Sequence, residues 1–241
     1  MARRPVKKDS LQHKVPEHTL RRIPSYHQIL TDLDIKEEQY VSSQFLATFF
    51  SIDDTQVRKD LSIIGYPGKP KTGYSVKGLK QAIGNFLGIN YENKAVLIGA
   101  GKLGSALIEY PGFRDYGLKI VGVFDNNPDK IGTLMGEFSI LSMESLPRVV
   151  RSYHISICII TVPKEAAQAV ADKLIELNIQ GIWNFSPVQL NVPDNVVLRN
   201  ENIAVGLAIL SHYVNKKKAG LTAVSGDASV TTKKYTASGN Q

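Results

Sequence analysis

Three glycines near the middle of the chain have the spacing of a turn that binds a dinucleotide. Gly99, Gly101 and Gly104 fit the pattern G-x-G-x-x-G. In this pattern the first glycine permits a tight turn, the second lets the backbone approach a pyrophosphate, and the third lets a helix pack closely on a strand. The pattern alone is weak evidence, but the next apolar run ends in Asp125, 21 residues beyond Gly104. A carboxylate there accepts hydrogen bonds from the adenosine ribose and repels a 2′-phosphate, so the stretch predicts NAD(H).

A second set of residues could contact a phosphate backbone. The stretch TQVRKDLS places Thr55, Gln56, Arg58 and Lys59 at the start of an expected helix, and residues 54–80 carry six Lys/Arg against two acids. Such a patch is typical of a face that meets a polyanion, although a solvated charged surface explains many patches of this kind. The lysines would bind phosphates, whereas Gln56 and Arg58 are the candidates for reading base edges.

The elements around this patch are expected to form a winged helix-turn-helix domain. Apolar residues recur at three- and four-residue steps in 23–33, 41–50 and 53–64, which predicts three helices. The stretch 66–76 has Pro and Gly on both sides of two lysines and predicts a short hairpin, or wing. The third helix would enter the major groove of double-stranded DNA. The residues expected at the DNA interface are Ser43, Gln44, Thr55, Gln56, Arg58, Lys59, Lys69, Lys71, Gly73 and Tyr74.

The second half of the chain alternates strands and helices, as in an α/β fold with a Rossmann-like doubly wound parallel sheet. Strands are expected in 94–98, 118–125, 155–163 and 181–187, and a helix in 164–179. Ligands of such sheets bind outside the carboxyl ends of the strands, although ordinary turns also occur there. The residues expected to bind the cofactor are Gly99, Ala100, Gly101, Lys102, Leu103, Gly104, Tyr110, Asp125, Lys130, Thr161, Val162, Pro163 and Asn184.

No catalytic group is evident beside the expected nucleotide site. A dehydrogenase needs a positioned proton donor and a group that anchors the substrate near the nicotinamide. The residues after the glycine turn are used to build the nucleotide fold. The histidines show no metal-ligand spacing, and Cys158 lies in an apolar strand, where a buried inert thiol is the better interpretation. We therefore expect a protein that senses its cofactor, is not an enzyme and holds no metal.

Composition and charge narrow the class of protein further. The 241 residues have a net charge of +7, and residues 1–22 and 211–241 together contribute +9. No apolar run approaches the roughly 20 residues of a membrane span, and the basic N-terminus lacks the apolar segment of a secretory signal. A single cysteine cannot form an internal disulfide. We expect a cytoplasmic protein of two domains without membrane contact.

The last expected helix, residues 199–215, is apolar around nearly its whole circumference. A helix of this kind must be buried, and packing or exchange between two subunits is the economical way to bury it. Folding back onto its own domain is the alternative. The expected organisation is a basic flexible arm (1–22), a winged-helix DNA-binding domain (23–90), a Rossmann NAD(H)-binding domain (91–198), the dimerisation helix (199–215) and a flexible tail (216–241).

Together these stretches resemble the Rex family of redox-sensing transcriptional repressors. The resemblance covers about residues 22–212 and is carried by QVRKDLS, GKPKTGY, GAGKLGSALIEYPGF, VFDNNPDKIG, TVPKEAAQ and NFSPVQL, in family order. It implies a homodimer on a palindromic operator, Rossmann domains that bind NAD+ or NADH, and a C-terminal helix swapped between subunits. In the family, NADH releases the protein from operators of fermentation and respiration genes, and NAD+ competes for the same pocket.

The resemblance also implies roles for single residues. It places the three glycines at the pyrophosphate, Asp125 at the adenosine ribose and Tyr110 near the nicotinamide. The family couples that tyrosine to an arginine of the first helix and an aspartate of the swapped helix, whereas Gln28 and Asn202 stand at those positions here. Both charges are lost together, so neither is left buried and unpaired. We hypothesise that nucleotide binding persists while the NADH response is weakened or altered.

Two other functions stay open on the residues alone. One is an NAD-dependent oxidoreductase with an N-terminal extension, whose turnover would survive removal of residues 1–80. The other is a nucleotide-binding interaction module related to the CoA-binding domains of acyl-CoA ligases. Competition by CoA but not by NAD(H) would favour that module.

Overall fold

The computed structural model describes residues 15–218 and divides them into two compact units, residues 15–87 and 88–218. The boundary lies three residues before the domain boundary expected from the sequence. The expected arm (1–22) lies outside the described residues up to residue 14, and so does the tail beyond residue 218. None of the helices in residues 15–218 is long and apolar enough to cross a membrane.

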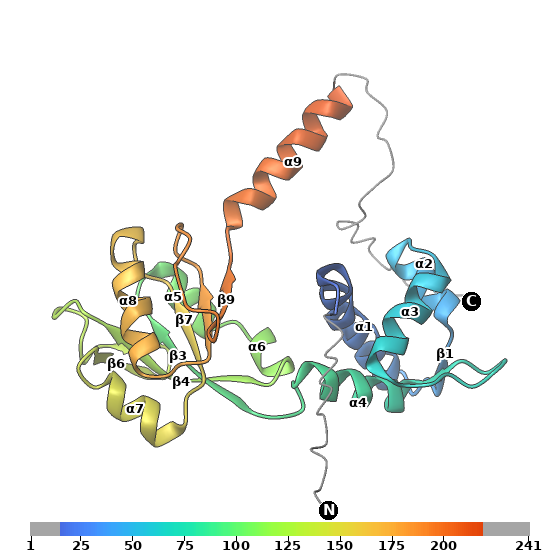
Figure 1. The fold of residues 1–241 in the computed structure, drawn as a ribbon, viewed down its shortest axis with the longest axis horizontal. Coiled ribbons are helices and arrows are strands. Elements are labelled where there is room, and N and C mark those ends of the chain that lie inside the picture. The colour runs from blue at the N-terminus through green and yellow to red at the C-terminus, as the bar shows by residue number, and fades with distance from the viewer. Residues whose placement is uncertain (1–14, 219–241) are drawn as a thin grey trace, which may run out of the picture. The chain divides into compact units, whose positions relative to one another are not determined.

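The first unit is a small helical domain with a two-stranded sheet (Figure 1). Its core is apolar and comes from every helix: the side chains of Ile23, Leu46, Leu61 and Ile83 are fully buried. Along the chain its elements are α1 (Glu17–Ile35), β1 (Tyr40–Val41), α2 (Ser43–Phe50), α3 (Asp54–Ile64), β2 (Tyr74–Ser75) and α4 (Val76–Leu87).

The helix ends of the helix-turn-helix carry residues that cap helices well. The Ser42 hydroxyl accepts a hydrogen bond from the Phe45 N–H at 3.0 Å, and Asp53 Oδ1 accepts one from the Thr55 N–H at 2.7 Å. Gly65 ends α3 with a φ of +78°, a left-handed conformation that glycine adopts without steric cost. Polar caps therefore hold the tight connection between α2 and α3.

One expectation for this unit is wrong, and one of its helices was not expected. Helix α1 begins at Glu17, so residues 17–22 belong to a helix and not to an arm, because Thr19 and Arg22 bond to α3. The expected wing is present and is short. Residues 69 and 73 close a tight turn, and β2 then pairs with β1, where a Cβ at Gly73 would collide with the Val41 carbonyl. Helix α4 was not expected.

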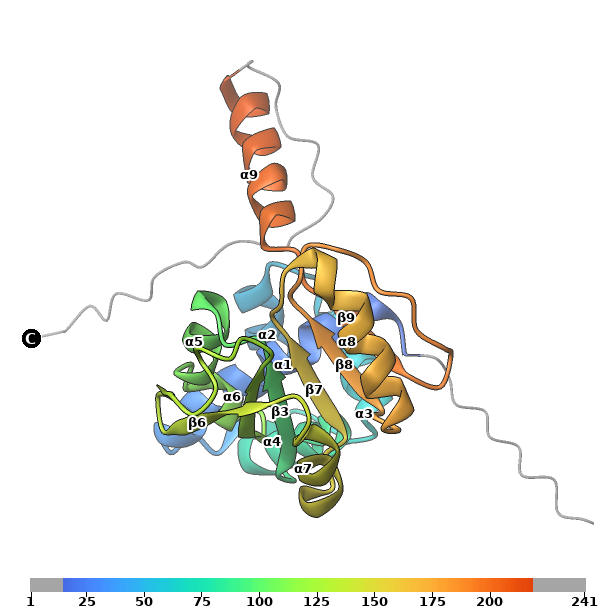
Figure 2. The same cartoon turned by 90° about the vertical axis from the view of Figure 1, so that its left-hand side faces the viewer.

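The second unit is a doubly wound sheet, as expected (Figure 2). The strand order is β5-β6-β4-β3-β7-β8-β9, and every pair except β5–β6 is parallel. Its elements are β3 (Asn93–Ile98), α5 (Lys102–Ile108), α6 (Gly112–Asp115), β4 (Leu118–Asp125), β5 (Leu134–Met135), β6 (Phe138–Ser142), α7 (Leu146–Tyr153), β7 (Ile157–Ile160), α8 (Lys164–Glu176), β8 (Gly181–Asn184), β9 (Val197–Asn200) and α9 (Ile203–Lys218).

Helices cover both faces of this sheet. Figure 2 shows α7 and α8 on one side, where Val150 and Leu174 join the core around Val96. Helices α5 and α6 lie on the other side, where Leu107 and Phe113 pack near Leu97. The chain crosses from β3 to β4 on one side of β3 and reaches β7 on the other. The carboxyl ends of these three strands therefore meet at the switch point where doubly wound sheets bind ligands.

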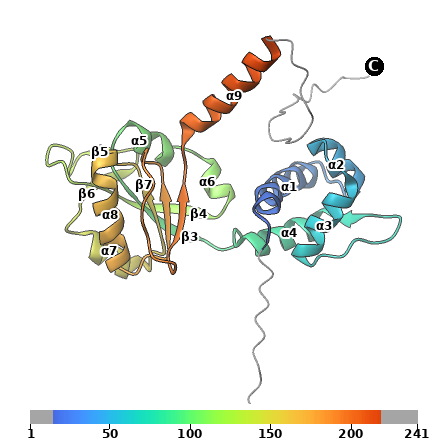
Figure 3. The same cartoon turned by 45° about the horizontal axis from the view of Figure 1, so that its top comes forward.

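Helix α9 follows β9 at the end of the second unit (Figure 3). Its apolar side chains are exposed to solvent. Leu207 is 66% exposed and Leu210 is 58% exposed. The expected start at residue 199 is wrong, because residues 199 and 200 pair with β8 as the end of β9. A helix whose apolar side chains are exposed on all sides does not bury them against its own chain.

Candidate functional site

The glycine turn between β3 and α5 has one side that packs and one side that is open. Gly99 has a φ of +109°, and a Cβ there would lie 2.8 Å from the Thr161 carbonyl; a Cβ at Gly104 would collide with the Gly99 carbonyl oxygen. Nothing lies within 4 Å of a Cβ built on Gly101. Two glycines are thus required by packing, whereas Gly101 leaves space where a ligand can approach the backbone.

Asp125 closes the turn from the neighbouring strand. Its Oδ2 accepts hydrogen bonds from the Ala100 N–H at 2.8 Å and from Lys130 Nζ at 3.0 Å, and its Oδ1 accepts one from the Asn127 N–H at 2.9 Å. Burial raises the pKa of Asp125, but the bonds from Asn127, Lys130 and Ala100 outweigh it and lower the pKa. The carboxylate is therefore charged and able to accept bonds from ribose hydroxyls.

The residues at the ends of β7 and β8 hold the glycine turn in place and offer few free groups that could contact a ligand. The Thr161 hydroxyl donates to the Gly99 carbonyl at 2.8 Å, and the Ser186 hydroxyl donates to the Val162 carbonyl at 2.6 Å. Asn184 is fully buried, and its amide bonds to Val188 and Asn200 at 2.7 and 2.8 Å. The amide joins β8 to β9 and to the loop after β8; its expected contact with the cofactor stays a prediction.

The remaining expected cofactor residues differ in their access to solvent. Lys102 is exposed at the start of α5, Leu103 and Val162 are half-buried, and Pro163 is exposed before α8. Tyr110 is 56% exposed, and its ring packs edge-on against Phe113 with 5.2 Å between centroids. Tyr110 lies just beyond the end of α5.

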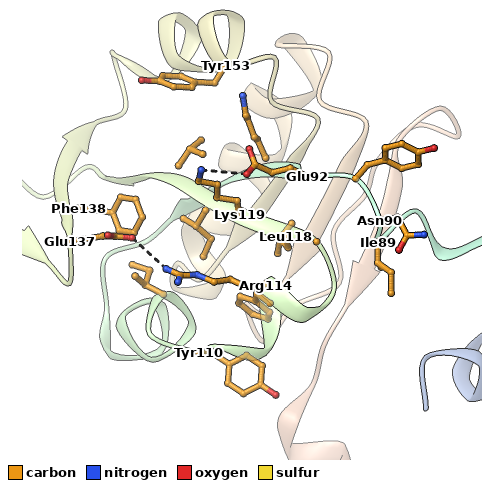
Figure 4. Close-up of a pocket in the computed structure, with 17 residues that line it drawn as sticks. Ile89, Asn90, Glu92, Tyr110, Arg114, Leu118, Lys119, Glu137, Phe138 and Tyr153 are labelled. Atoms are coloured by element: carbon orange, nitrogen blue, oxygen red, sulfur yellow. Dashed lines mark ion pairs between the residues drawn. The ribbon is translucent and has the colours of Figure 1, made fainter. Parts of the chain in front are cut away.

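A cavity of about 920 Å³ lies near the amino ends of β3 and β4 (Figure 4). Lys94 and Lys119 at the amino ends of β3 and β4 line it, together with Tyr110, Phe138 and Tyr153. None of the three motif glycines lines it. The glycine turn is a better candidate for a nucleotide site than this cavity, because a helix N-terminus with free N–H groups and the charged Asp125 lie at the carboxyl ends of the parallel strands.

Helix α3 presents cations to solvent, but two of its expected base-reading side chains already have partners. Gln56 is half-buried, and its Nε2 donates to Asp60 Oδ1 at 2.9 Å. Arg58 Nη1 lies 2.7 Å from Asp54 Oδ2, and Lys59 is exposed. Of the two candidates, Arg58 is better placed to reach a base edge, since Gln56 is held against its own domain.

A buried carboxylate on the inner face of α3 was missed by sequence reasoning. Asp60 is fully buried and accepts hydrogen bonds from Thr19, Tyr26 and Gln56 at 2.9–3.0 Å, and from Arg22 through two nitrogens at 2.7 and 2.9 Å. Burial raises the pKa of Asp60, but the bonds from Arg22, Gln56, Tyr26 and Thr19 lower it overall. This network fixes the orientation of α3 on α1.

The other expected DNA contacts lie around α3 in the first unit. Gln44 is exposed in the first turn of α2, and Ser43 is half-buried beside its cap. Lys69 and Lys71 are exposed in the tight turn, and Lys69 Nζ lies 5.9 Å from the centroid of the Tyr40 ring. Gly73 and Tyr74 are half-buried because they join this turn to β1.

Two family models match the chain, one in each unit. Residues 14–62 match a putative DNA-binding protein N-terminus, and residues 90–188 match a CoA binding domain. The redox-sensing transcriptional repressor Rex of Treponema denticola is 41% identical over 86% of this chain and 99% of that protein, and that of Desulfitobacterium hafniense is 42% identical over 86% and 98%. The chain belongs to the Rex family of redox-sensing transcriptional repressors. Its membership confirms the expectation of a regulator that is not an enzyme.

Solved structures of this family share the fold. RSP in complex with β-NAD+ and operator DNA has a TM-score of 0.79 and 33% identity, covering 87% of this chain and 99% of that one. RSP in complex with β-NADH has a TM-score of 0.77 and 31% identity, covering 86% and 97%. The expected fold, a winged helix-turn-helix domain followed by a Rossmann-like sheet, is therefore confirmed.

Proposed function

We propose that this Rex-family chain is a repressor that binds double-stranded DNA through α3 and adjusts that binding to the NAD+ or NADH held at its glycine turn. The observation that carries the proposal is the open backbone at Gly101 beside the charged Asp125. This arrangement supports the binding of a dinucleotide, and the same chain carries a cationic helix-turn-helix. The structures of RSP in complex with β-NAD+ and operator DNA and in complex with β-NADH support both ligands.

The residues present fit the dinucleotide. The N–H groups at the start of α5 would bind the pyrophosphate, and Asp125 would accept bonds from the adenosine ribose. Thr161 holds the turn in place. Its hydroxyl hydrogen is not available to the cofactor, because it already donates to a carbonyl of the turn. The protein would sense whether the bound nicotinamide is oxidised or reduced. It needs no group that takes part in hydride transfer.

A homodimer completes the proposal. The exposed apolar side chains of α9, such as Leu207 and Leu210, need a partner, and a second copy of the helix satisfies them. A two-fold dimer presents two copies of α3, which suits a palindromic operator. Because such an operator lies on the chromosome, we place the protein in the cytoplasm.

We also propose that NADH acts on this protein more weakly than on family members with a charged relay. Gln28 is exposed on α1, and Asn202 is exposed before α9, where its Oδ1 accepts the Ala204 N–H at 3.1 Å. Neither side chain carries a charge that a cofactor could redistribute. Asn202 instead stabilises the first turn of α9 as a cap.

Fluorescence anisotropy with a labelled palindromic duplex tests these proposals. The duplex is the one that the wild-type protein selects from a random pool, and binding is measured without cofactor and with NAD+, NADH or CoA. We expect binding that falls steeply with salt, little release by NADH, and no effect of CoA. Release by low NADH that excess NAD+ leaves unchanged would contradict the weakened response. Failure to bind any duplex in every cofactor state would overturn the function itself.

A CoA effect in the same titration would favour the second candidate, a nucleotide-binding module, which the CoA binding domain model over residues 90–188 suggests. The Arg58→Ala variant is the matched control. It removes the exposed guanidinium of α3 and leaves the glycine turn intact. It should lose operator binding and retain NADH binding.

A further inference from the structure

Helix α3 carries an acid on the surface that would face DNA. Asp54 is the first residue of the helix, and its Oδ2 lies 2.7 Å from Arg58 Nη1, one helical turn away. The two side chains are 35% and 54% exposed. A carboxylate at this position is repelled by phosphates, so its presence beside the base-reading arginine requires a physical account.

The second acid at this helix end has a separate role. Asp53 caps α3 through the Thr55 N–H at 2.7 Å. Bonds from Thr55 lower the pKa of Asp53, together with the charges of Arg58 and Lys59 and against a smaller effect of burial. Capping is therefore complete without Asp54, and the bond of Asp54 to Arg58 is left to explain.

Because the Gln56 amide is bonded within its own domain, Arg58 is the main directional hydrogen-bond donor on this surface. The Gln56 amide donates to the buried Asp60 at 2.9 Å, and moving it outward would remove one of the bonds that satisfy that carboxylate. Lys59 is a compact cation that suits a phosphate, whereas a guanidinium matches the two acceptors of guanine. Recognition of a base pair by α3 thus depends on where the Arg58 guanidinium points.

We propose that Asp54 is a specificity-determining residue for the DNA site: it holds Nη1 of Arg58 so that the other guanidinium nitrogens donate to guanine. Arg58 has five N–H donors in a rigid plane, so a bond at Nη1 fixes the plane and leaves donors for O6 and N7. The second Asp54 oxygen then accepts from the amino group of a neighbouring cytosine or adenine. This inference rests on the proposed DNA-binding function.

An ion pair of the same spacing elsewhere in the unit supplies the control. Arg21 Nε lies 3.3 Å from Glu17 Oε1 on α1, and both side chains are more than 60% exposed. Glu17→Gln removes one negative charge from the same unit outside α3. Its effect on DNA affinity measures the general electrostatic change, which should be equal for every duplex.

The experiment measures the affinities of wild type, Asp54→Ala, Asp54→Glu and Glu17→Gln for the selected operator and for its single base-pair substitutions. We expect Asp54→Ala to lower discrimination at one guanine in each half-site by about fivefold, which corresponds to about 1 kcal/mol. Discrimination elsewhere should be unchanged. Asp54→Glu, which still reaches Arg58, should restore part of it, and Glu17→Gln should shift all affinities by one factor. Thermal unfolding confirms that each variant is folded.

The outcomes separate this inference from the function on which it rests. A uniform shift in Asp54→Ala, or no shift, overturns the specificity role while leaving DNA binding intact. Loss of discrimination at every position also overturns it, because that result indicates a displaced helix. Wild-type protein that binds no duplex overturns both the inference and the proposed function.

Discussion

Asp60 in the winged-helix unit and Asp125 in the Rossmann unit are both nearly buried carboxylates with a lowered pKa, but their donors differ. Asp60 accepts five bonds, all from side chains of α1 and α3, and Asp125 accepts three, two of them from backbone N–H groups. A carboxylate offers about four lone-pair sites. Asp60 is saturated by its own domain, whereas Asp125 retains capacity on Oδ1. Counting donors thus separates a carboxylate that holds the fold from one that can hold a ligand.

The largest effect that would test this contrast is the loss of Asp60. Asp60→Ala leaves Arg22 without its carboxylate and three other side-chain donors without an acceptor, so we expect the first unit to lose about 3 kcal/mol of unfolding free energy. Hydrogen exchange of peptides from α1 and α3, read by mass spectrometry, measures it. Asp125→Ala should leave these peptides unchanged. Normal protection of α3 in Asp60→Ala would show that the network is dispensable.

The glycine turn offers a smaller effect with a built-in control. Gly99→Ala forces a Cβ against the Thr161 carbonyl at a positive φ, so we expect a loss of about 1–3 kcal/mol in the second unit. Gly101→Ala meets nothing within 4 Å and should change stability by less than about 0.5 kcal/mol. It should nevertheless weaken NADH binding about tenfold, equal to about 1.4 kcal/mol. Equal NADH affinities of wild type and Gly101→Ala, by calorimetry, would refute the assignment.

Lowering the pH should reduce the stabilisation that Asp60 and Asp125 each give to the folded protein. The pKa of each is lower in the folded than in the unfolded protein, so its stabilisation is fully present above the unfolded value of about 4 and is lost as the pH falls below it. Exchange protection of α1 and α3 should therefore be constant from pH 7 to about pH 5 and fall in more acidic buffer. In Asp60→Asn the fall should be shallower. A fall already complete by pH 6 would point to histidine instead.

The smallest effect concerns the one exposed donor of Asp125. Lys130 is 39% exposed and partly neutralises the carboxylate that opposes a 2′-phosphate. Lys130→Ala should raise the preference for NADH over NADPH by no more than about fivefold, in line with an exposed ion pair of up to about 1 kcal/mol. Lys130→Arg keeps the charge and should retain the wild-type ratio. A preference that falls in Lys130→Ala would mean that Lys130 does not neutralise Asp125.

The sequence indicates most elements of the fold because their signals are local. The expected strand 118–125 has the bounds of β4, and the caps Ser42 and Asp53 are residue types that favour helix N-termini. Helix α4 was overlooked, although Val76, Leu79 and Ile83 are spaced as in a buried helical face, because Gly78 and Gly84 interrupt the run. Strand β9 has mostly exposed residues and lacks the apolar pattern of a central strand.

The site residues were less predictable than the elements. The Asp60 network joins residues 34 to 41 positions apart in the chain, and no local pattern contains that information. The bonds of Gln56 to Asp60 and of Arg58 to Asp54 are both four residues apart and could have been expected from helical spacing. Asn184 follows the rule for strand ends, but only the packing of β8 on β9 shows that its amide is enclosed.

The apolar helix α9 belongs to the second unit and the DNA-facing helix α3 to the first. In the proposed dimer, a chain that has lost the function of α3 still pairs with an intact chain. Such a mixed dimer can bind only one half-site and cannot bind both halves of a palindromic operator. Alleles that damage α3 should consequently be dominant when both forms are made in one cell, whereas alleles that damage α9 should be recessive.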